Sequence, residues 1–199
     1  LATLAHELRN PLAPIRSGLQ LLRAAPGQPE VLSEAQAMLE RQVTQIVRLV
    51  DDLMDVSRIN RDKIALLKEP LALATVLGSA VETSRPLIDQ MRHELVLDLP
   101  DEPIIVDADL TRLSQVFSNL LNNAAKYSEP GRRIWVSARL EGTEVRVAVR
   151  DEGVGIPPEE LPGVFEIFSQ LDTSIGRSQG GLGVGLTLVR RLLEMHGGS

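Results

Sequence analysis

The first third of the chain places apolar side chains three and four residues apart, the spacing that lines them along one edge of an α-helix. The spacing runs through a first segment, stops in the stretch 25–29 with its prolines and glycine, and returns in a second segment. The positions are Leu8, Leu12, Ile15, Leu19 and Leu22, then Leu39, Val43, Ile46, Val50, Leu53 and Ser57. We therefore predict two helices within residues 1–64, joined by a short loop.

A hairpin of two helices leaves this apolar edge uncovered. We expect two copies of the chain to pair along it, which gives a homodimer with a four-helix bundle. A monomeric hairpin packed against the following domain is the alternative that the pattern leaves open.

The pattern changes beyond Glu69-Pro70 to a mixture of strands and helices. Strands are predicted at 93–99, 104–106, 133–140 and 145–149, and helices at 74–91, 110–127 and 184–195. Asp109 is a suitable N-cap for the second of these helices, and residues 141–144 join the last two strands into a hairpin. Residues 157–182 are expected to form a loop. We expect two domains, residues 1–66 and 67–199.

Composition narrows the function classes. A net charge of -6 over 199 residues argues against a nucleic-acid partner, because a phosphate backbone is bound mainly by clustered Lys and Arg. The sequence has no cysteine, which excludes disulfides and thiolate metal sites. No apolar run approaches the roughly 18 residues that span a bilayer. We expect a cytoplasmic segment of a longer chain, without direct membrane contact, since Leu1 begins inside a helical pattern and Gly197-Gly198 can precede another strand.

Two glycine clusters are candidates for phosphate binding, at 151–157 and at 180–185. Such a cluster is often only a tight connection. The second one opens into the last predicted helix, whose free amide groups suit an anionic phosphate. Neither cluster has the Gly-Lys-Ser/Thr of a P-loop or the position of a Rossmann fingerprint.

The predicted helix 110–127 has an amide-rich face. Asn119 and Asn123 lie four residues apart and Lys126 follows three residues later, so all three project from one side. Asparagine oxygen is a suitable ligand for Mg2+, and lysine can neutralise phosphate. A solvated face is the alternative, but asparagine is a poor helix former and its use here favours a site.

Four motifs, in this order, resemble the N, G1, F and G2 boxes of sensor histidine kinases. They read Asn119-Leu-Leu-Asn-Asn123-Ala-Ala-Lys126-Tyr127, Asp151-Glu-Gly153-Val-Gly155, Phe165-Glu-Ile-Phe168 and Gly181-Leu182-Gly183-Val-Gly185. The resemblance implies an α/β sandwich of the histidine kinase ATP-binding type, with a mixed sheet and helices on one face, that binds ATP and Mg2+.

The same resemblance assigns roles to these residues. Asn123 is expected to ligate Mg2+, Asn119, Lys126 and Tyr127 to line the nucleotide, and Asp151 to accept a hydrogen bond from the adenine amino group. Gly153 and Gly155 would shape the adenine pocket. The segment between Phe168 and Gly181 would be a lid, with Gly181, Leu182, Gly183 and Gly185 at its hinge onto the phosphates.

His6 lies in Ala5-His6-Glu7-Leu8-Arg9-Asn10-Pro11, which is similar to the H box of the same family. A lone helical histidine is usually structural, but neutral imidazole is a competent nucleophile toward a γ-phosphate. The resemblance implies that His6 accepts the phosphoryl group and that Glu7 orients the ring and takes up its proton. Asn10 would position a water for dephosphorylation of a partner. His93 and His196 match no motif and are interpreted as surface or helix-end residues.

We expect ATP-dependent autophosphorylation of His6, followed by transfer to an aspartate in the receiver domain of a response regulator. An ATP hydrolase of the same superfamily is one alternative, but it needs a glutamate as general base where this chain has Asn119. The other alternative is a degenerate dimeric scaffold that binds ATP and signals only by conformation. The presence of His6, Asn123 and Asp151 argues against it.

Overall fold

A computed structural model describes residues 11–24, 28–59, 65–167, 169 and 183–199 of the chain. It divides into two compact units, Leu1–Arg61 with Glu166–Val184, and Asp62–Phe165 with Gly185–Ser199. The described part of the first unit is mainly a helical hairpin, and the second is an α/β unit. The predicted domain boundary between residues 66 and 67 remains a prediction.

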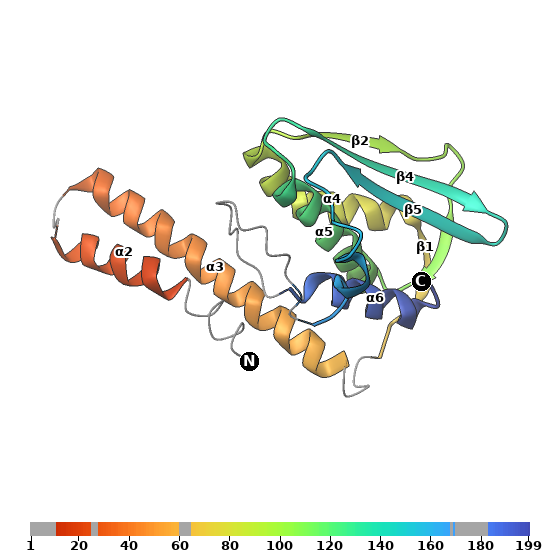
Figure 1. The fold of residues 1–199 in the computed structure, drawn as a ribbon, viewed down its shortest axis with the longest axis horizontal. Helices are drawn as coiled ribbons and strands as arrows, with labels where there is room; N and C mark the ends of the chain where they lie inside the picture. The colour runs from red at the N-terminus through yellow and green to blue at the C-terminus, as the bar shows by residue number, and fades with distance from the viewer. Residues whose placement is uncertain (1–10, 25–27, 60–64, 168, 170–182) are drawn as a thin grey trace. The chain divides into compact units, whose positions relative to one another are not determined.

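The hairpin consists of α2, Leu12–Ala24, and α3, Pro29–Ile59 (Figure 1). Pro29 suits the first position of a helix, because its fixed φ is helical and its missing N–H would have no partner there. The helices meet where Gly18 is buried against Leu39, and a Cβ on Gly18 would lie 3.2 Å from the Leu39 side chain. Both predicted helices are therefore present, although the predicted part of the first before residue 11 lies outside the described residues.

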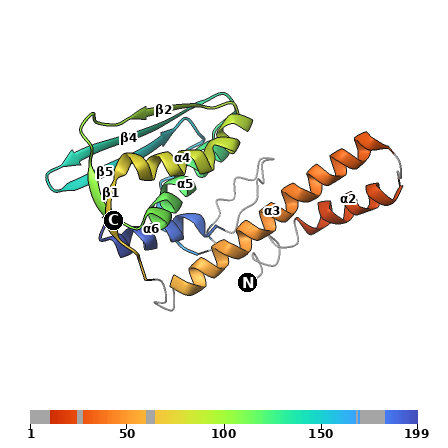
Figure 2. The same ribbon diagram turned by 180° about the vertical axis from the view of Figure 1, so that it is seen from behind.

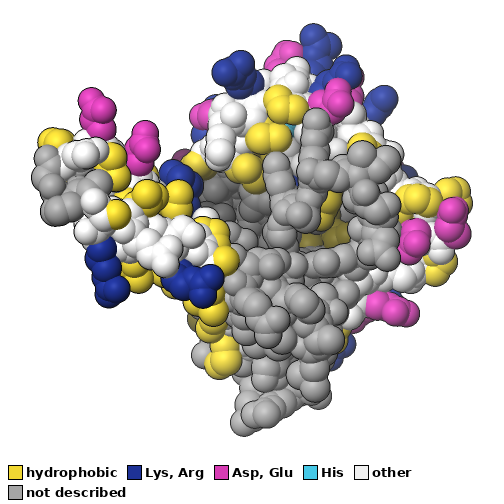
Figure 3. All heavy atoms as spheres, turned by 60° about the vertical axis from the view of Figure 1, so that its left-hand side comes forward, with side chains coloured by type: hydrophobic (Ala, Val, Ile, Leu, Met, Phe, Trp, Pro, Cys, Tyr) yellow, Lys and Arg dark blue, Asp and Glu magenta, His cyan; other side chains and the backbone are white. Residues whose placement is uncertain are grey.

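The apolar edge predicted for the hairpin is exposed in the single chain. Leu12, Leu19, Val43 and Val50 are each between 45% and 53% exposed, and apolar side chains are visible along the hairpin in Figure 3. The packing of α2 on α3 therefore leaves this edge uncovered, as the spacing predicts.

The larger sheet of the second unit contains β2, Glu94–Asp98, β4, Arg133–Glu141, and β5, Glu144–Asp151, in the order β2-β4-β5. β2 runs parallel to β4, and β4 runs antiparallel to β5, so the predicted mixed sheet is confirmed. Alternate residues of β4, namely Ile134, Val136 and Ala138, are fully buried on one face.

A second, two-stranded sheet pairs β1, Glu69–Ala72, with β3, Ile105–Ala108. β1 was not predicted from the sequence. It is four residues long and contains Pro70, which lacks the N–H of a strand residue, so its local pattern is weak. Its pairing depends instead on β3, more than thirty residues further along the chain.

The helices of this unit lie on one side of the larger sheet (Figures 1 and 2). They are α4, Leu73–Gln90, α5, Leu110–Tyr127, and α6, Gly185–His196. The core between helices and sheet consists of aliphatic side chains that are almost fully buried, including Val76, Leu77, Ile88, Val116, Leu121, Leu188 and Leu192. None of the helices in the described part of the chain is long and apolar enough to cross a bilayer.

Candidate functional site

The amide-rich face predicted for residues 119–126 lies in the C-terminal half of α5. Asn119, Asn123 and Lys126 are all partly buried. The Nδ2 atom of Asn119 is buried and has no hydrogen-bond partner among the described residues. Buried polar atoms are nearly always hydrogen-bonded in folded proteins. This amide therefore suits a polar ligand held against α5, which is consistent with a nucleotide there.

Asp151 is the last residue of β5 and is exposed. Its Oδ1 atom accepts hydrogen bonds from the Gly153 N–H at 2.7 Å and, at 3.5 Å, from the hydroxyl of Ser128. Both described contacts use the same oxygen. The carboxylate thus has a defined orientation, while its other oxygen keeps its capacity to accept a hydrogen bond.

The end of α5 and the turn after β5 are joined by direct contacts. The Val154 N–H donates to the carbonyl of Tyr127 at 3.3 Å. A Cβ on Gly153 would lie 2.6 Å from Asp151 Oδ1 and 2.7 Å from the Tyr127 carbonyl oxygen, so only glycine fits. Gly155 has φ +71°, a conformation that L side chains rarely adopt. The structure therefore brings together two motifs that lie more than twenty residues apart.

Ser128 was not identified as a site residue from the sequence. It follows the last residue of α5, is 2% exposed, and donates to Asp151. A polar residue directly after a predicted helix is an ordinary turn signal, which is why it was overlooked. Its burial beside the carboxylate makes it a candidate positioning residue.

Lys126 and Tyr127 supply a cation and an aromatic ring at the edge of the site. The Lys126 ammonium lies 5.0 Å from the centre of the Tyr127 ring, which is within the range of a cation–π contact. Tyr127 is about half exposed. Both residues can thus meet a ligand that approaches from solvent.

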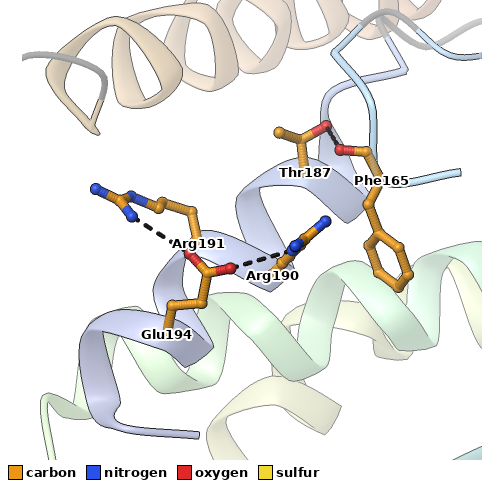
Figure 4. A network of polar contacts seen from close by, with 5 residues as sticks. All are labelled: Phe165, Thr187, Arg190, Arg191 and Glu194. Atoms are coloured by element: carbon orange, nitrogen blue, oxygen red, sulfur yellow. Dashed lines mark hydrogen bonds and ion pairs between the residues drawn. The ribbon is translucent and has the colours of Figure 1, made fainter. Parts of the chain in front are cut away.

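The first turn of α6 is tied to the segment that precedes the predicted lid. Thr187 donates from its hydroxyl to the Phe165 carbonyl at 2.8 Å (Figure 4). Further along the helix, Arg191 and Arg190 both bond to Glu194 and lower the pKa of that carboxyl. Gly183, with φ +65°, lies two residues before the helix begins at Gly185. The predicted phosphate hinge therefore leads into a helix start that is held in place.

The opposite end of α5 is capped by Asp109, as predicted. Its carboxylate accepts from the Arg112 N–H at 3.1 Å and from the Leu67 N–H at 3.0 Å. Burial raises the pKa of Asp109, but hydrogen bonds from the amides of Leu67, Arg112 and Thr111 outweigh burial, so the pKa is lowered. The Asp109 N–H in turn donates to His196 Nε2 at 3.1 Å.

Several predicted site residues lie outside the described residues. They are His6, Glu7, Asn10, Gly181 and Leu182, together with Phe168 of the third motif. Within the described ranges, no group of three or more His, Asp or Glu side chains is placed to hold a metal ion. The amide oxygen of Asn123, together with oxygens of the nucleotide and water, would be suitable ligands for Mg2+.

Two protein families match this chain. Residues 1–62 match the His Kinase A (phospho-acceptor) domain, and residues 108–199 match the histidine kinase-, DNA gyrase B- and HSP90-like ATPase. Together the two matches include all four motifs and the segment around His6.

Among relatives, the circadian input-output histidine kinase CikA of Synechococcus elongatus is 36% identical over the whole chain, which spans 27% of its length. The structure of the mycobacterial sensor histidine kinase MprB is 31% identical, with 67% of this chain and 83% of that chain covered and a TM-score of 0.56. The full-length structure of ShkA in complex with AMPPNP is 29% identical, with 100% of this chain and 41% of that chain covered and a TM-score of 0.70. The chain spans less than half the length of the curated relatives it matches.

Proposed function

The chain belongs to the sensor histidine kinases of two-component systems, and on this premise we propose that it transfers the γ-phosphoryl group of ATP to its own His6 and then to an aspartate of a response regulator receiver domain. The observation that carries the proposal is the junction of α5 with the turn after β5. There the end of the helix that carries the amide-rich face contacts an oriented carboxylate and a glycine that admits no side chain. The ATPase domain match and the AMPPNP complex of ShkA support ATP as the nucleotide.

The described residues divide the work of holding the nucleotide. The free oxygen of Asp151 accepts from the adenine amino group, and Gly153 leaves room for the ring. Asn119, Lys126 and Tyr127 contact the nucleotide along α5, and Asn123 provides an oxygen for Mg2+, which neutralises phosphate charge when bound. Gly155 shapes the adenine pocket together with Gly153, and Gly183 and Gly185 meet the phosphates. Gly181 and Leu182, which lie outside the described residues, are assigned to the phosphates by the motif alone.

His6 is the proposed nucleophile. A ring nitrogen of His6 forms a bond to the γ-phosphorus while the bond from that phosphorus to the bridging oxygen breaks, and ADP leaves. Glu7 accepts the ring proton, which is a general-base role. A carboxylate oxygen of the regulator's aspartate then bonds to the phosphorus while the P–N bond breaks, and the ring regains a proton from Glu7, which restores neutral His6. Asn10, one turn after His6, positions a water when the chain acts as a phosphatase toward that regulator.

The exposed apolar edge of the hairpin supports a homodimer. Leu12, Leu19, Val43 and Val50 lie at the predicted positions and are about half exposed in the single chain. Covering apolar surface of this kind contributes about 25 cal/mol per Å2 buried. We propose that a second hairpin covers it in a four-helix bundle.

Incubation of the chain with γ-labelled ATP and Mg2+ tests the kinase proposal. Wild type should acquire acid-labile label, while His6→Gln and Asn123→Ala should not. Label that persists in His6→Gln contradicts the phosphoacceptor assignment. Free phosphate without labelled protein would favour the hydrolase instead.

Sedimentation of the same chain at micromolar concentration tests the dimer. We expect the mass of two chains for wild type, and a shift toward one chain for the double variant Leu19→Glu, Val43→Glu. A monomeric wild type contradicts the dimer, whereas the kinase proposal is judged by the labelling alone.

A further inference from the structure

His93 lies in the turn between α4 and β2 and is only 7% exposed. The turn is tight, since Arg92 has φ +57° and the His93 N–H donates to the Ile88 carbonyl at 3.0 Å. The interpretation of His93 as a surface residue is therefore wrong. The ring is enclosed between the last turn of α5 and the turn that leads into β4.

Both ring nitrogens of His93 face carbonyl oxygens. Nε2 lies 2.9 Å from the oxygen of Ala125, and Nδ1 lies 3.2 Å from the oxygen of Arg132. A neutral imidazole has a single N–H, so one of its nitrogens would direct a lone pair at an oxygen lone pair. An imidazolium donates to both. Ala125 is in the last turn of α5, where unpaired carbonyls and the helix dipole favour a cation.

His196 shows the opposite arrangement in the same unit. Its Nδ1 lies 2.7 Å from the Leu192 carbonyl oxygen, while its Nε2 accepts from the Asp109 N–H at 3.1 Å. A ring with a single N–H satisfies both partners, because one nitrogen donates and the other accepts. The ring nitrogens of the two histidines therefore face different partners, two carbonyl oxygens for His93 and one carbonyl oxygen and one N–H for His196.

The segments that pack against His93 carry charged residues: Asp89, Arg92 and Glu94 next to it in sequence, Lys126 on α5, and Glu129, Arg132 and Arg133 in the turn before and at the start of β4. The acidic members pair with arginines, Asp89 with Arg85, Glu94 with Arg133 and Glu129 with Arg132. Among the described residues, no carboxylate forms an ion pair with the ring. The partners of the ring protons are thus the two carbonyl groups.

The turn between Ala125 and Arg132 supports the proposed nucleotide site. Within this turn Ser128 donates to Asp151, and directly after it the Arg133 N–H donates to the Glu152 carboxylate at 3.0 Å. We propose that His93, as an imidazolium, is a positioning residue that holds this turn, and through it Asp151, in the geometry that binds nucleotide. The inference rests on the proposed nucleotide site. As pH rises and the ring loses its proton, nucleotide affinity falls.

Nitrogen-15 NMR of the histidine rings in the ligand-free chain tests the protonation directly. We expect both nitrogens of His93 to show the signature of N–H groups at pH 6.5, while His196 shows one protonated and one unprotonated nitrogen. A neutral His93 ring at that pH would overturn the proposal. This measurement requires neither a variant nor nucleotide.

Calorimetric binding of AMPPNP between pH 6 and 8.5 tests the link to the site. We compare wild type with His93→Phe, His93→Gln and, as the matched control, His196→Gln. At each pH we take the ratio of the wild-type affinity to the affinity of His93→Phe. Between pH 6 and 8.5 this ratio should fall on the order of fivefold, which is at the low end of usual coupling energies between two sites. Titration of the nucleotide itself cancels in that ratio. The affinity of His93→Gln, which keeps one donor, should lie between those of wild type and His93→Phe. His196→Gln should show the same dependence of affinity on pH as wild type.

The outcomes separate the two proposals. A ratio that does not change with pH would overturn the role of His93 while leaving the nucleotide site intact. Wild type that fails to bind AMPPNP at every pH would overturn the nucleotide site itself, and the role of His93 with it.

Discussion

The two ends of helix α5 are built from opposite kinds of partner. At the N-terminal end the carboxylate of Asp109 accepts from the N–H groups of Leu67 and Arg112, and the Asp109 N–H donates to Nε2 of His196. At the C-terminal end the Val154 N–H donates to the Tyr127 carbonyl, and Nε2 of His93 lies 2.9 Å from the Ala125 carbonyl oxygen, to which it is proposed to donate. The arrangement follows the helix dipole, with an acid at one end and a donor or cation at the other.

From this difference we infer that the N-terminal end serves stability alone, whereas the C-terminal end also supports the proposed nucleotide site. The partners of the N-terminal end come from the linker before β1 and from the end of α6. Those of the C-terminal end come from the segments that carry Ser128, Asp151 and Gly153. The contacts that end the helix are thus also the contacts of the proposed nucleotide site, and variants at the two ends should have separable effects.

The largest effect is expected from Asp151→Asn at the C-terminal end. The substitution removes the charge and places an amide where the carboxylate accepts from Gly153 and the ligand. We expect AMPPNP affinity, measured by calorimetry, to fall on the order of a hundredfold, as for loss of hydrogen bonds to a charged group. Asp107→Asn, on the exposed side of β3, should bind as wild type does. An affinity within threefold of wild type for Asp151→Asn would contradict the adenine assignment.

A pair of glycine substitutions gives the next largest effect. Gly153→Ala forces a methyl group against Asp151 and the Tyr127 carbonyl, so we expect a loss of about 1–3 kcal/mol in the free energy of unfolding together with weaker AMPPNP binding. Gly78→Ala, in the exposed interior of α4, meets nothing within 4 Å and should raise stability by up to about 1 kcal/mol. Equal denaturant midpoints for the two variants would refute the close approach at Gly153.

Asp109→Asn probes the other end of the helix. The asparagine keeps one oxygen as acceptor, but its side-chain NH2 group then faces the backbone N–H of Leu67, so two donors meet. We therefore expect the free energy of unfolding at pH 7 to fall by about 1 kcal/mol. AMPPNP affinity should stay within twofold. Because the pKa of Asp109 is lowered from its ordinary value of 3.8, its stabilisation is fully present above that value and is lost as pH falls through the folded-state pKa.

Urea unfolding of wild type and Asp109→Asn at a series of pH values provides the check. The difference between them should shrink toward zero in acid. A difference that stays constant down to pH 2 would show that the charge of Asp109 does not contribute.

The smallest effect is expected from Ser128→Ala. Its hydroxyl reaches Asp151 at 3.5 Å, a long hydrogen bond, so AMPPNP affinity should fall about threefold. Ser114→Ala, which removes a buried bond to the Val76 carbonyl nearer the N-terminal end, should lower stability while leaving affinity unchanged. If Ser114→Ala weakens binding more than Ser128→Ala does, the proposed division between the two ends is wrong.

Much of the α/β unit could be predicted because its signals are local. The alternation along β4 and β5, the stripe of apolar residues on α5 and the Asp109 cap all depend on residues within one element. The predicted strand 93–99 and helix 184–195 agree with β2 and α6 to within one residue at each end. The ordered motifs predict which ends of the elements carry the site, and that part stays a prediction.

What the sequence did not predict depends on partners that are distant in the chain. β1 forms because β3 pairs with it, and the parallel pairing of β2 with β4 has no local signal. Ser128 and His93 gain their significance only from Asp151 and from the carbonyls of Ala125 and Arg132. Neither the burial of a histidine nor the polarity of the atoms around it can be read from its neighbours in sequence.

Mass-spectrometric mapping of the phosphorylated residue tests the central claim most directly, because it locates the group that the nucleotide site is proposed to transfer. After incubation with ATP and Mg2+ and digestion at alkaline pH, which preserves phosphohistidine, we predict a phosphoryl group on His6 in wild type. The same peptide should be unmodified in Asp151→Asn and Asn123→Ala. A phosphoryl group on another residue, or an unmodified His6 in a wild-type chain that binds AMPPNP, would contradict the account.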